Sequence, residues 1–363
     1  MFAQIKELAR MSAKRFVCCS SCFEGEGLRY NAALVGSASN RPCPACGRTE
    51  GLKLTEQQLA NAAYLFFVRG SFHRTSYGGA PLLQMNDTND GDGLPDTLGR
   101  DAEIVRRHTN LRVFHYGPRF WMIGHIEPLK LLRLPGRRHE VIPRVMDAYP
   151  DRVLRKGTRF YRMRLDPAKP EDADQYDAPP RHISGSGRLC RPGKPVLYGS
   201  QDMEICIHET RATVDDALYV ATLECERDLR LLDLSALLPE EGTEFDSLDH
   251  AVLFVFLAGK HAYDITRSFA DAAEAAGYDG IVYPSYFSRA RSGAETVETV
   301  YGLSGRRIEQ MREREDAKVI RNLALFGRPL ERGDVSVSSI NTVRLGHISY
   351  GAFLGPTGLS SDP

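Results

Sequence analysis

Neither sign of charge prevails in this chain of 363 residues, which holds 47 Lys and Arg and 47 Asp and Glu. Without a net field, charge alone gives no reason to expect a nucleic-acid or membrane partner. No run of eighteen apolar residues occurs, so a membrane-spanning helix is not expected. The first residues contain no uninterrupted apolar stretch of the secretory type. We therefore expect a cytoplasmic protein without a membrane partner.

Cysteine is sparse, with eight residues, but four of them form two close pairs, Cys19 with Cys22 and Cys43 with Cys46. Each pair can direct both sulfurs at one ion, and two such pairs fit a tetrahedral zinc site. Four thiolates leave no ligand position for water, so the zinc would be structural. The adjacent Cys18 fits the two-residue gap less well than Cys19. The alternative is a set of buried, reduced cysteines without metal.

Helical patterns occur in the N-terminal part of the chain. Residues 1–15 have apolar side chains at helical spacing, and residues 54–67 repeat the pattern with Thr55 as the N-cap candidate. Residues 96–109 are also expected to form a helix. None of these segments carries a chemical motif, so we interpret them as structural.

The remainder of the N-terminal half has less distinct patterns. Residues 111–126 alternate as a hairpin does. The acidic segment 86–96 partly fits a calcium loop, but the closing Glu is absent, so we favour a solvated loop. We expect residues 1–50 to form the zinc-binding module and residues 51–150 to form a middle region of unidentified fold.

The pattern changes near residue 157, where strands and apolar helices follow one another. Residues 158–165 alternate as a half-buried strand does, and residues 166–182 form a polar loop that we interpret as a flap. The further strands expected from apolar or alternating runs cover residues 195–198, 218–223, 229–234, 278–283, 322–326 and 336–350. The expected helices are one that carries Glu209 and two buried ones over residues 249–260 and 263–276, the last ended by Gly277. Residues 351–363 read as a frayed tail.

Three segments carry a specific combination of residues. The first is Phe160-Tyr161-Arg162-Met163-Arg164, the second contains Gly187-Arg188, Leu197-Tyr198 and Glu209, and the third ends in Tyr283-Pro284-Ser285. In this order, over about residues 155–350, they resemble the RES family, which is named for an Arg, a Glu and a Ser. The order of the three segments is far more specific than any one of them.

The resemblance implies a fold and an activity. The fold would be α+β, with an ADP-ribosyltransferase-like catalytic domain at residues 151–355 that contains a split, mostly antiparallel β-sheet. The substrate would be NAD, cleaved between nicotinamide and ribose by phosphorolysis or hydrolysis, with phosphate as the co-substrate in the first case. The alternative is transfer of ADP-ribose to a protein or nucleic acid. Several family members are bacterial toxins, so an antitoxin protein is an expected partner.

The resemblance also implies roles for individual residues. Glu209 would be the catalytic carboxylate, since cleavage develops positive charge on the ribose that a carboxylate stabilises. Arg162 would face the substrate as a cation with a planar fork, which suits a pyrophosphate. Ser285 would hydrogen-bond the substrate, but no base partner marks it as a nucleophile. The expected NAD-binding residues are Tyr161, Arg188, Tyr198, whose ring would stack on nicotinamide, and Tyr283.

Plainer interpretations exist for each residue taken alone. Glu209 also fits a helix surface residue that pairs with Arg211 or His208, and Arg162 also fits a solvated strand face. A rival of another class is a zinc-dependent nucleic-acid-binding protein whose second domain has lost activity. The intact Arg162, Glu209 and Ser285 argue against that rival.

Overall fold

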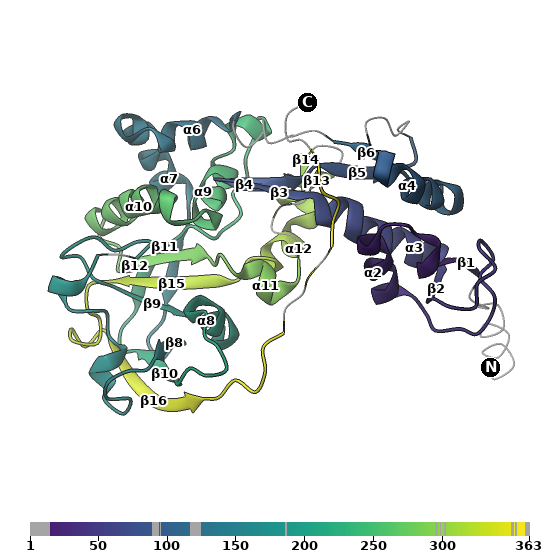
Figure 1. Ribbon diagram of the computed structural model, residues 1–363. Helices are drawn as coiled ribbons and strands as arrows, with labels where there is room; N and C mark the ends of the chain where they lie inside the picture. Colours follow the sequence, from purple (N-terminus) through teal and green to yellow (C-terminus); the bar gives the residue numbers. More distant parts are fainter. Residues whose placement is uncertain are drawn as a thin grey trace, which may run out of the picture. The chain divides into compact units, whose positions relative to one another are not determined.

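The computed structural model describes residues 15–88, 94, 96–116, 125–185, 187–294, 297, 299–300, 303–349, 352 and 354–359. The chain divides into two compact units (Figure 1), and we describe each separately. Unit 1 comprises residues 1–75, 79–121 and 350–363, and unit 2 comprises residues 76–78 and 122–349. All but the last residue of the helix expected over residues 1–15, most of the acidic loop and the second half of the expected hairpin lie outside the described residues. The three-part division at residues 50 and 150 stays a prediction.

The described residues of unit 1 form short strands and three α-helices, together with shorter helical turns. Strands β1 and β2 pair antiparallel, as do β5 and β6, and a further two-stranded sheet joins β3 and β4. The bounds are β1 Phe16–Cys19, α2 Glu26–Val35, β2 Lys53–Thr55, α3 Glu56–Ala63, β3 Phe72–Thr75, β4 Gly78–Pro81, β5 Leu83–Asn86, α4 Asp96–Thr109 and β6 Arg112–His115. The helices expected near residues 54–67 and 96–109 are confirmed. The first strand of the expected hairpin is β6, and it pairs with the preceding β5. Its partner is selected by packing within the unit, which the local sequence pattern does not contain.

The N-cap expected at Thr55 is confirmed as a capping box. Thr55 Oγ1 accepts from the N–H of Gln58 at 3.3 Å, and the Gln58 side chain accepts from the N–H of Thr55 at 3.0 Å. This exchange satisfies two donors that the first helical turn leaves without partners. It places the apolar stripe of α3, including Leu59, in the same core as Phe23 and Leu28.

The C-terminal segment is not a frayed tail where it is described. The side-chain N–H of Asn31, in α2, donates to the carbonyl of Leu354 at 2.8 Å. Leu359 packs against the core of unit 1. The sequence expectation fails here because Asn31 is fully buried and needs a partner that no local pattern reveals.

Unit 2 is built on an eight-stranded sheet with the order β16-β10-β8-β9-β15-β12-β11-β7. Among these described strands only β11 and β12 run parallel, which confirms the expected α+β fold with a mostly antiparallel sheet. Its strands are β7 Asp151–Leu154, β8 Arg159–Leu165, β9 Val196–Ser200, β10 Leu218–Cys225, β11 Leu229–Asp233, β12 Gly280–Pro284, β15 Arg321–Phe326 and β16 Val335–Val343. A small hairpin adds β13 Thr299–Val300 and β14 Leu303–Ser304.

The sheet is split between β8 and β9. These strands pair only at Tyr161 and Ser200, whereas β8 pairs with β10 over its whole length. The joint divides the sheet into one part made of β16, β10 and β8 and another made of β9, β15, β12, β11 and β7. The split sheet expected from the resemblance is therefore present.

Helices cover one face of this sheet. Their inward side chains share a core with Ile281, Tyr283 and Ala324 of the central strands. The covering helices are α6 Glu127–Arg133, α7 Ile142–Ala148, α9 Leu248–Leu257 and α10 Tyr263–Ala275, while α8 Met203–Thr210, α11 Ser288–Ser292 and α12 Arg312–Ala317 lie outside that core. Both apolar helices expected from the sequence are confirmed, and Gly277, with φ +78°, follows the end of α10 as expected.

The other face of the sheet is covered in part by the segment that the sequence suggested as a flap. Tyr176 is fully buried there against Phe160, Leu197 and Leu323. This part of the segment is therefore a core connection, because its aromatic side chain packs under the sheet. In the part of the chain that the structure describes, no helix is long and apolar enough to cross a membrane.

Candidate active site and candidate metal centre

Glu209 lies in the last turn of α8. Asp202 caps the other end of this helix by accepting from the N–H of Ile205 at 2.9 Å, which fixes where the helix begins. The Glu209 side chain is exposed, yet its Oε1 accepts a hydrogen bond from Ser285 Oγ at 2.6 Å. The structure thus brings together the Glu and the Ser that the sequence places 76 residues apart.

Ser285 follows β12 and is fully buried. Its N–H donates to the carbonyl of Ile320 at 2.8 Å, and its Oγ accepts from the N–H of Phe287 at 3.1 Å. The hydroxyl hydrogen is directed at Glu209. The side chain therefore orients the carboxylate, and the expected direct hydrogen bond from Ser285 to a substrate stays a prediction.

Asn322 is a third member of this cluster, and the sequence analysis did not single it out. It lies on β15 directly opposite Tyr283 of β12 and Ser200 of β9. Its Nδ2 donates to Glu209 Oε1 at 2.6 Å, so two donors meet on one carboxylate oxygen. The strand was expected, but the register that sets Asn322 beside Tyr283 is a long-range property.

Tyr283 is buried and Tyr198 half-buried on the helix-covered side of the sheet. Burial, and next the charge of Glu209, raise the pKa of Tyr283, while Arg188 and the nearby Asn322 side chain act in the opposite direction. Burial also raises the pKa of Tyr198, whose hydroxyl accepts from the N–H of Leu189 at 2.9 Å. Both phenols therefore stay neutral at physiological pH.

Arg188 is held by the end of helix α9. Its guanidinium donates to the carbonyls of Val255 at 3.3 Å and Ala258 at 3.0 Å, and it stacks 4.8 Å from the ring centre of Tyr263. A Cβ at the preceding Gly187 would lie 2.8 Å from the Tyr198 hydroxyl, so this position requires glycine. The loop that carries Arg188 is thus closely fitted to Tyr198.

Arg162 lies on the opposite face of the sheet from Tyr161, because side chains alternate along β8. It is 7% exposed, and its guanidinium donates to the carbonyls of Tyr198 at 2.8 Å and Asp177 at 3.1 Å. Burial lowers the pKa of this guanidinium to about 10. Among the described residues its Nε has no partner. This placement suits a structural role, in which Arg162 bridges the two strands at the split. The sequence predicted a cation that faces the substrate.

Tyr161 lies in the same row across the sheet as the carboxylate cluster. It pairs with Ser200, which pairs with Asn322, which in turn pairs with Tyr283. The row places Tyr161 three strands from Tyr283. Hydrogen bonds thus join Glu209, Ser285 and Asn322, Tyr283 lies opposite Asn322, and Tyr161 lies further along the row.

This cluster can stabilise a positive charge. Glu209 supplies a carboxylate with one oxygen held by two donors and the other accepting no hydrogen bond from the described residues. Preorganised charge of this kind acts on a transition state without reorganising during the reaction. A cavity of about 790 Å³ in unit 2 is lined by Arg152, Asp233 and Arg321 among others, and none of the predicted site residues lines it.

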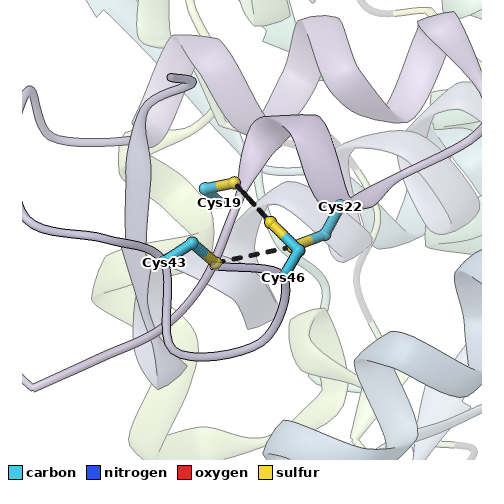
Figure 2. A group of neighbouring side chains, drawn as sticks. All are labelled: Cys19, Cys22, Cys43 and Cys46. Atoms are coloured by element: carbon cyan, nitrogen blue, oxygen red, sulfur yellow. Dashed lines mark hydrogen bonds between the residues drawn. The ribbon is translucent and has the colours of Figure 1, made fainter. Parts of the chain in front are cut away.

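The four predicted metal ligands of unit 1 form one cluster (Figure 2). Sγ of Cys19 lies 3.8 Å from that of Cys22 and 3.7 Å from that of Cys46, and the Cys22 and Cys43 sulfurs are 3.6 Å apart. A tetrahedral ion with Zn–S bonds of about 2.3 Å sets ligand sulfurs about 3.8 Å apart. The four sulfurs all lie within 4.8 Å of one another, so these residues fit a single zinc ion.

Neighbouring residues explain the shape of the cysteine cluster. Gly47, with φ +72°, donates its N–H to the carbonyl of Cys43 at 2.8 Å and closes the second turn. Burial, with smaller contributions from the neighbouring thiols, raises the pKa of Cys18 to about 12. Cys18 belongs to the core of unit 1. The preference for Cys19 over Cys18 as the ligand agrees with this geometry.

The segment of unit 2 that contains Glu209 and Ser285 is similar to a known protein family. Residues 159–297 match the family model of the RES domain, which confirms the resemblance for this segment. The chain therefore carries a RES domain together with an N-terminal cysteine cluster that fits a metal.

Other similarities are weak. The crystal structure of the M. tuberculosis MbcT-MbcA toxin-antitoxin complex is similar at a TM-score of 0.33 and 14% identity, over 56% of this chain and 92% of that chain. So low a score carries no argument about this protein. No curated protein sequence matches the chain.

Proposed function

We propose that this protein degrades NAD by cleaving the bond between nicotinamide and ribose. The observation that carries the proposal is the Glu209 carboxylate, whose Oε1 accepts from Ser285 and Asn322 at 2.6 Å each. Glu209 and Ser285 both lie in the segment that matches the RES domain, a family that implies NAD as the substrate.

The chemistry requires few groups. Departure of nicotinamide leaves an oxocarbenium-like ribose, and a carboxylate beside it stabilises the developing charge. The leaving group is already cationic in NAD, so no strong general acid is needed. In this proposal Tyr198 stacks on nicotinamide, and Arg188 binds a phosphate after exchanging its present carbonyl partners, Val255 and Ala258. Tyr161 and Tyr283 complete the NAD site.

The acceptor that completes the reaction is phosphate or water in the first version of this proposal. Phosphate would give ADP-ribose-1″-phosphate, and water would give ADP-ribose. Either reaction would deplete NAD, which is the action of a toxin or defence effector. A protein antitoxin that covers the site is the partner implied by the family.

The experiment is to incubate the purified chain with NAD, with and without phosphate, and to identify the products by mass. Glu209→Gln should lower kcat about 100- to 1,000-fold, as the loss of one transition-state partner does elsewhere. The matched control is Glu204→Gln, on the same helix, where an exposed carboxylate pairs with Arg291 at 3.1 Å. It should retain the wild-type rate.

Three outcomes separate the versions of the proposal. Nicotinamide with ADP-ribose-1″-phosphate identifies a phosphorylase, and free ADP-ribose identifies a hydrolase. NAD that is cleaved only when a protein or nucleic acid is added, with ADP-ribose attached to it, identifies the alternative, a mono-ADP-ribosyltransferase. Turnover by Glu209→Gln at the wild-type rate would show that Glu209 is not the catalytic carboxylate.

We also propose that Cys19, Cys22, Cys43 and Cys46 hold a structural zinc ion. The support is the sulfur geometry, with the measured separations of 3.6–3.8 Å close to those of tetrahedral ligands. All four ligand positions are cysteine, so the ion would stabilise the fold of unit 1 and would take no part in cleaving NAD.

A further inference from the structure

We infer that Asn322 is a positioning residue for Glu209, holding one carboxylate oxygen so that the other faces the ribose. This inference rests on the proposed cleavage of NAD and adds a residue to it. Asn322 touches the carboxylate and no reacting atom, so its role is to orient and not to react. It lies outside the segment matched by the RES domain model, which ends at residue 297.

The geometry of Glu209 carries the inference. Asn322 Nδ2 and Ser285 Oγ both donate to Oε1 at 2.6 Å, and among the described residues Oε2 accepts no hydrogen bond. Asn322 is 3% exposed and Ser285 is fully buried, whereas Glu209 is exposed. The carboxylate is therefore fixed from the protein side through one oxygen and open to a ligand at the other.

A buried amide on this strand needs such a partner. After Asn322 the strand continues Leu323-Ala-Leu-Phe326, and these four residues are packed in apolar cores. An asparagine left without hydrogen bonds among them would destabilise the fold. Asn322 instead finds its partner in the site, since its Nδ2 donates to Glu209 while Tyr283 lies directly opposite it on the neighbouring strand.

The position of Glu209 in its helix explains why two donors are useful. Glu209 lies in the last turn of α8, where the partial negative charge of the helix end opposes a carboxylate. Hydrogen bonds from neutral donors favour the ionised form and add no charge that would repel the developing cation. A lysine or arginine in the place of Asn322 would neutralise the charge that the reaction uses.

The test is the pH dependence of NAD cleavage by Asn322→Asp, a nearly isosteric change. The introduced carboxylate has no donor when it is ionised and repels Glu209, whereas its protonated form can donate to Oε1. We therefore expect kcat to fall about 10- to 100-fold at pH 8, in line with the loss of a hydrogen bond to a charged group, and to recover toward pH 5 relative to the wild type. The KM for NAD should change by less than about threefold.

Two further variants sharpen the result. Asn322→Leu removes the donor at every pH and should show the loss of kcat without recovery. Asn341→Asp, on exposed β16 of the same sheet, makes the same chemical change away from the site and should follow the wild-type profile. A loss in Asn322→Asp that is equal at all pH values would indicate a packing role and would overturn the inference, as would wild-type kcat at pH 8.

A second measurement separates this inference from the proposed function. If the wild-type chain leaves NAD intact under every condition, the proposed function fails, and crystal structures then decide the role of Asn322. Displacement of the Glu209 carboxylate in Asn322→Leu would support positioning, and an unmoved carboxylate would overturn it. If the wild type cleaves NAD but Asn322→Asp matches it, only the positioning role is lost.

Discussion

Replacing Arg162 by lysine would distinguish two roles of this residue, a structural bridge at the split in the sheet and a cation that faces the substrate. The Arg162 guanidinium lies beside the split in the sheet and donates to two backbone carbonyls, those of Tyr198 and Asp177. A lysine keeps the buried charge but has a compact head that cannot reach two carbonyls as a planar fork does. The substitution therefore removes a bridge while it leaves the sign of the charge unchanged.

The expected magnitude follows from two opposing contributions. Burial lowers the pKa of Arg162 to about 10, which corresponds to a cost of about 3 kcal/mol for keeping the cation inside. Two hydrogen bonds from a charged donor offset this by about 3–6 kcal/mol together. Lysine keeps the cost and loses one of the two bonds. We therefore expect Arg162→Lys to lower the free energy of unfolding by about 1.5–3 kcal/mol at pH 7.

The pH dependence has a definite sign. A cation whose pKa is lowered by folding destabilises the folded state fully below the folded pKa, and this cost disappears as pH rises toward the unfolded pKa. For arginine the pH window begins near the folded pKa of about 10 and extends upward to the ordinary arginine pKa. For lysine at the same position it ends near the ordinary lysine pKa of about 10.4. The stability deficit of Arg162→Lys should therefore shrink between pH 7 and pH 10.

Urea denaturation followed by circular dichroism measures both effects, with stability extrapolated to zero urea. The control is Arg159→Lys, on the same strand, where an exposed arginine pairs with Glu224 at 2.8 Å and should be replaceable at a cost below about 1 kcal/mol. An Arg162→Lys variant as stable as the wild type, with the KM for NAD raised tenfold or more, would refute the structural role of Arg162 and support a substrate-facing cation.

Two other predictions concern the cysteine cluster and a buried ion pair. The purified chain should contain one zinc ion by elemental analysis, and Cys43→Ser or a strong chelator should lower the melting temperature of unit 1; a metal-free chain that melts unchanged with chelator would contradict the zinc site. Asp249→Ala should destabilise unit 2 by about 3–5 kcal/mol in urea, because it leaves the guanidinium of Arg306, now held at 2.6 and 2.9 Å, buried without a counter-charge. A loss below about 1 kcal/mol would show that solvent reaches this pair.

Local patterns predicted most helices and strands but not which strands pair. The capping box at Thr55 and the alternation of β8 are encoded within a few residues, so the sequence alone reveals them. Strands β10 and β11 are separated by a short turn, yet β10 pairs with β8 and β16 while β11 pairs with β7 and β12. Partner choice depends on packing across the whole sheet, which no local window contains.

The site shows the same division between local and long-range information. Glu209 and Ser285 follow from motifs of the RES pattern, whereas their 2.6 Å contact joins residues 76 positions apart and is long-range information. The side of β8 that faces a ligand could not be predicted, because both faces of this sheet carry cores and alternation then identifies no exposed face. The resemblance assigned Arg162 to the substrate side, and this role stays a prediction, while the structure shows the guanidinium bonded to two backbone carbonyls.

Asn322 indicates which feature of a sequence could have located the missing part of the site. It is the polar residue of an otherwise apolar run, and a buried polar side chain is retained only where hydrogen bonds compensate its desolvation. Its compensation comes from Glu209, 113 residues earlier in the chain. An asparagine in a core strand therefore marks a position where stability alone would favour an apolar residue. In this protein the buried Asn322 contacts Glu209, the carboxylate that we propose to be catalytic. A positioning role explains both the burial of this asparagine and its contact with Glu209.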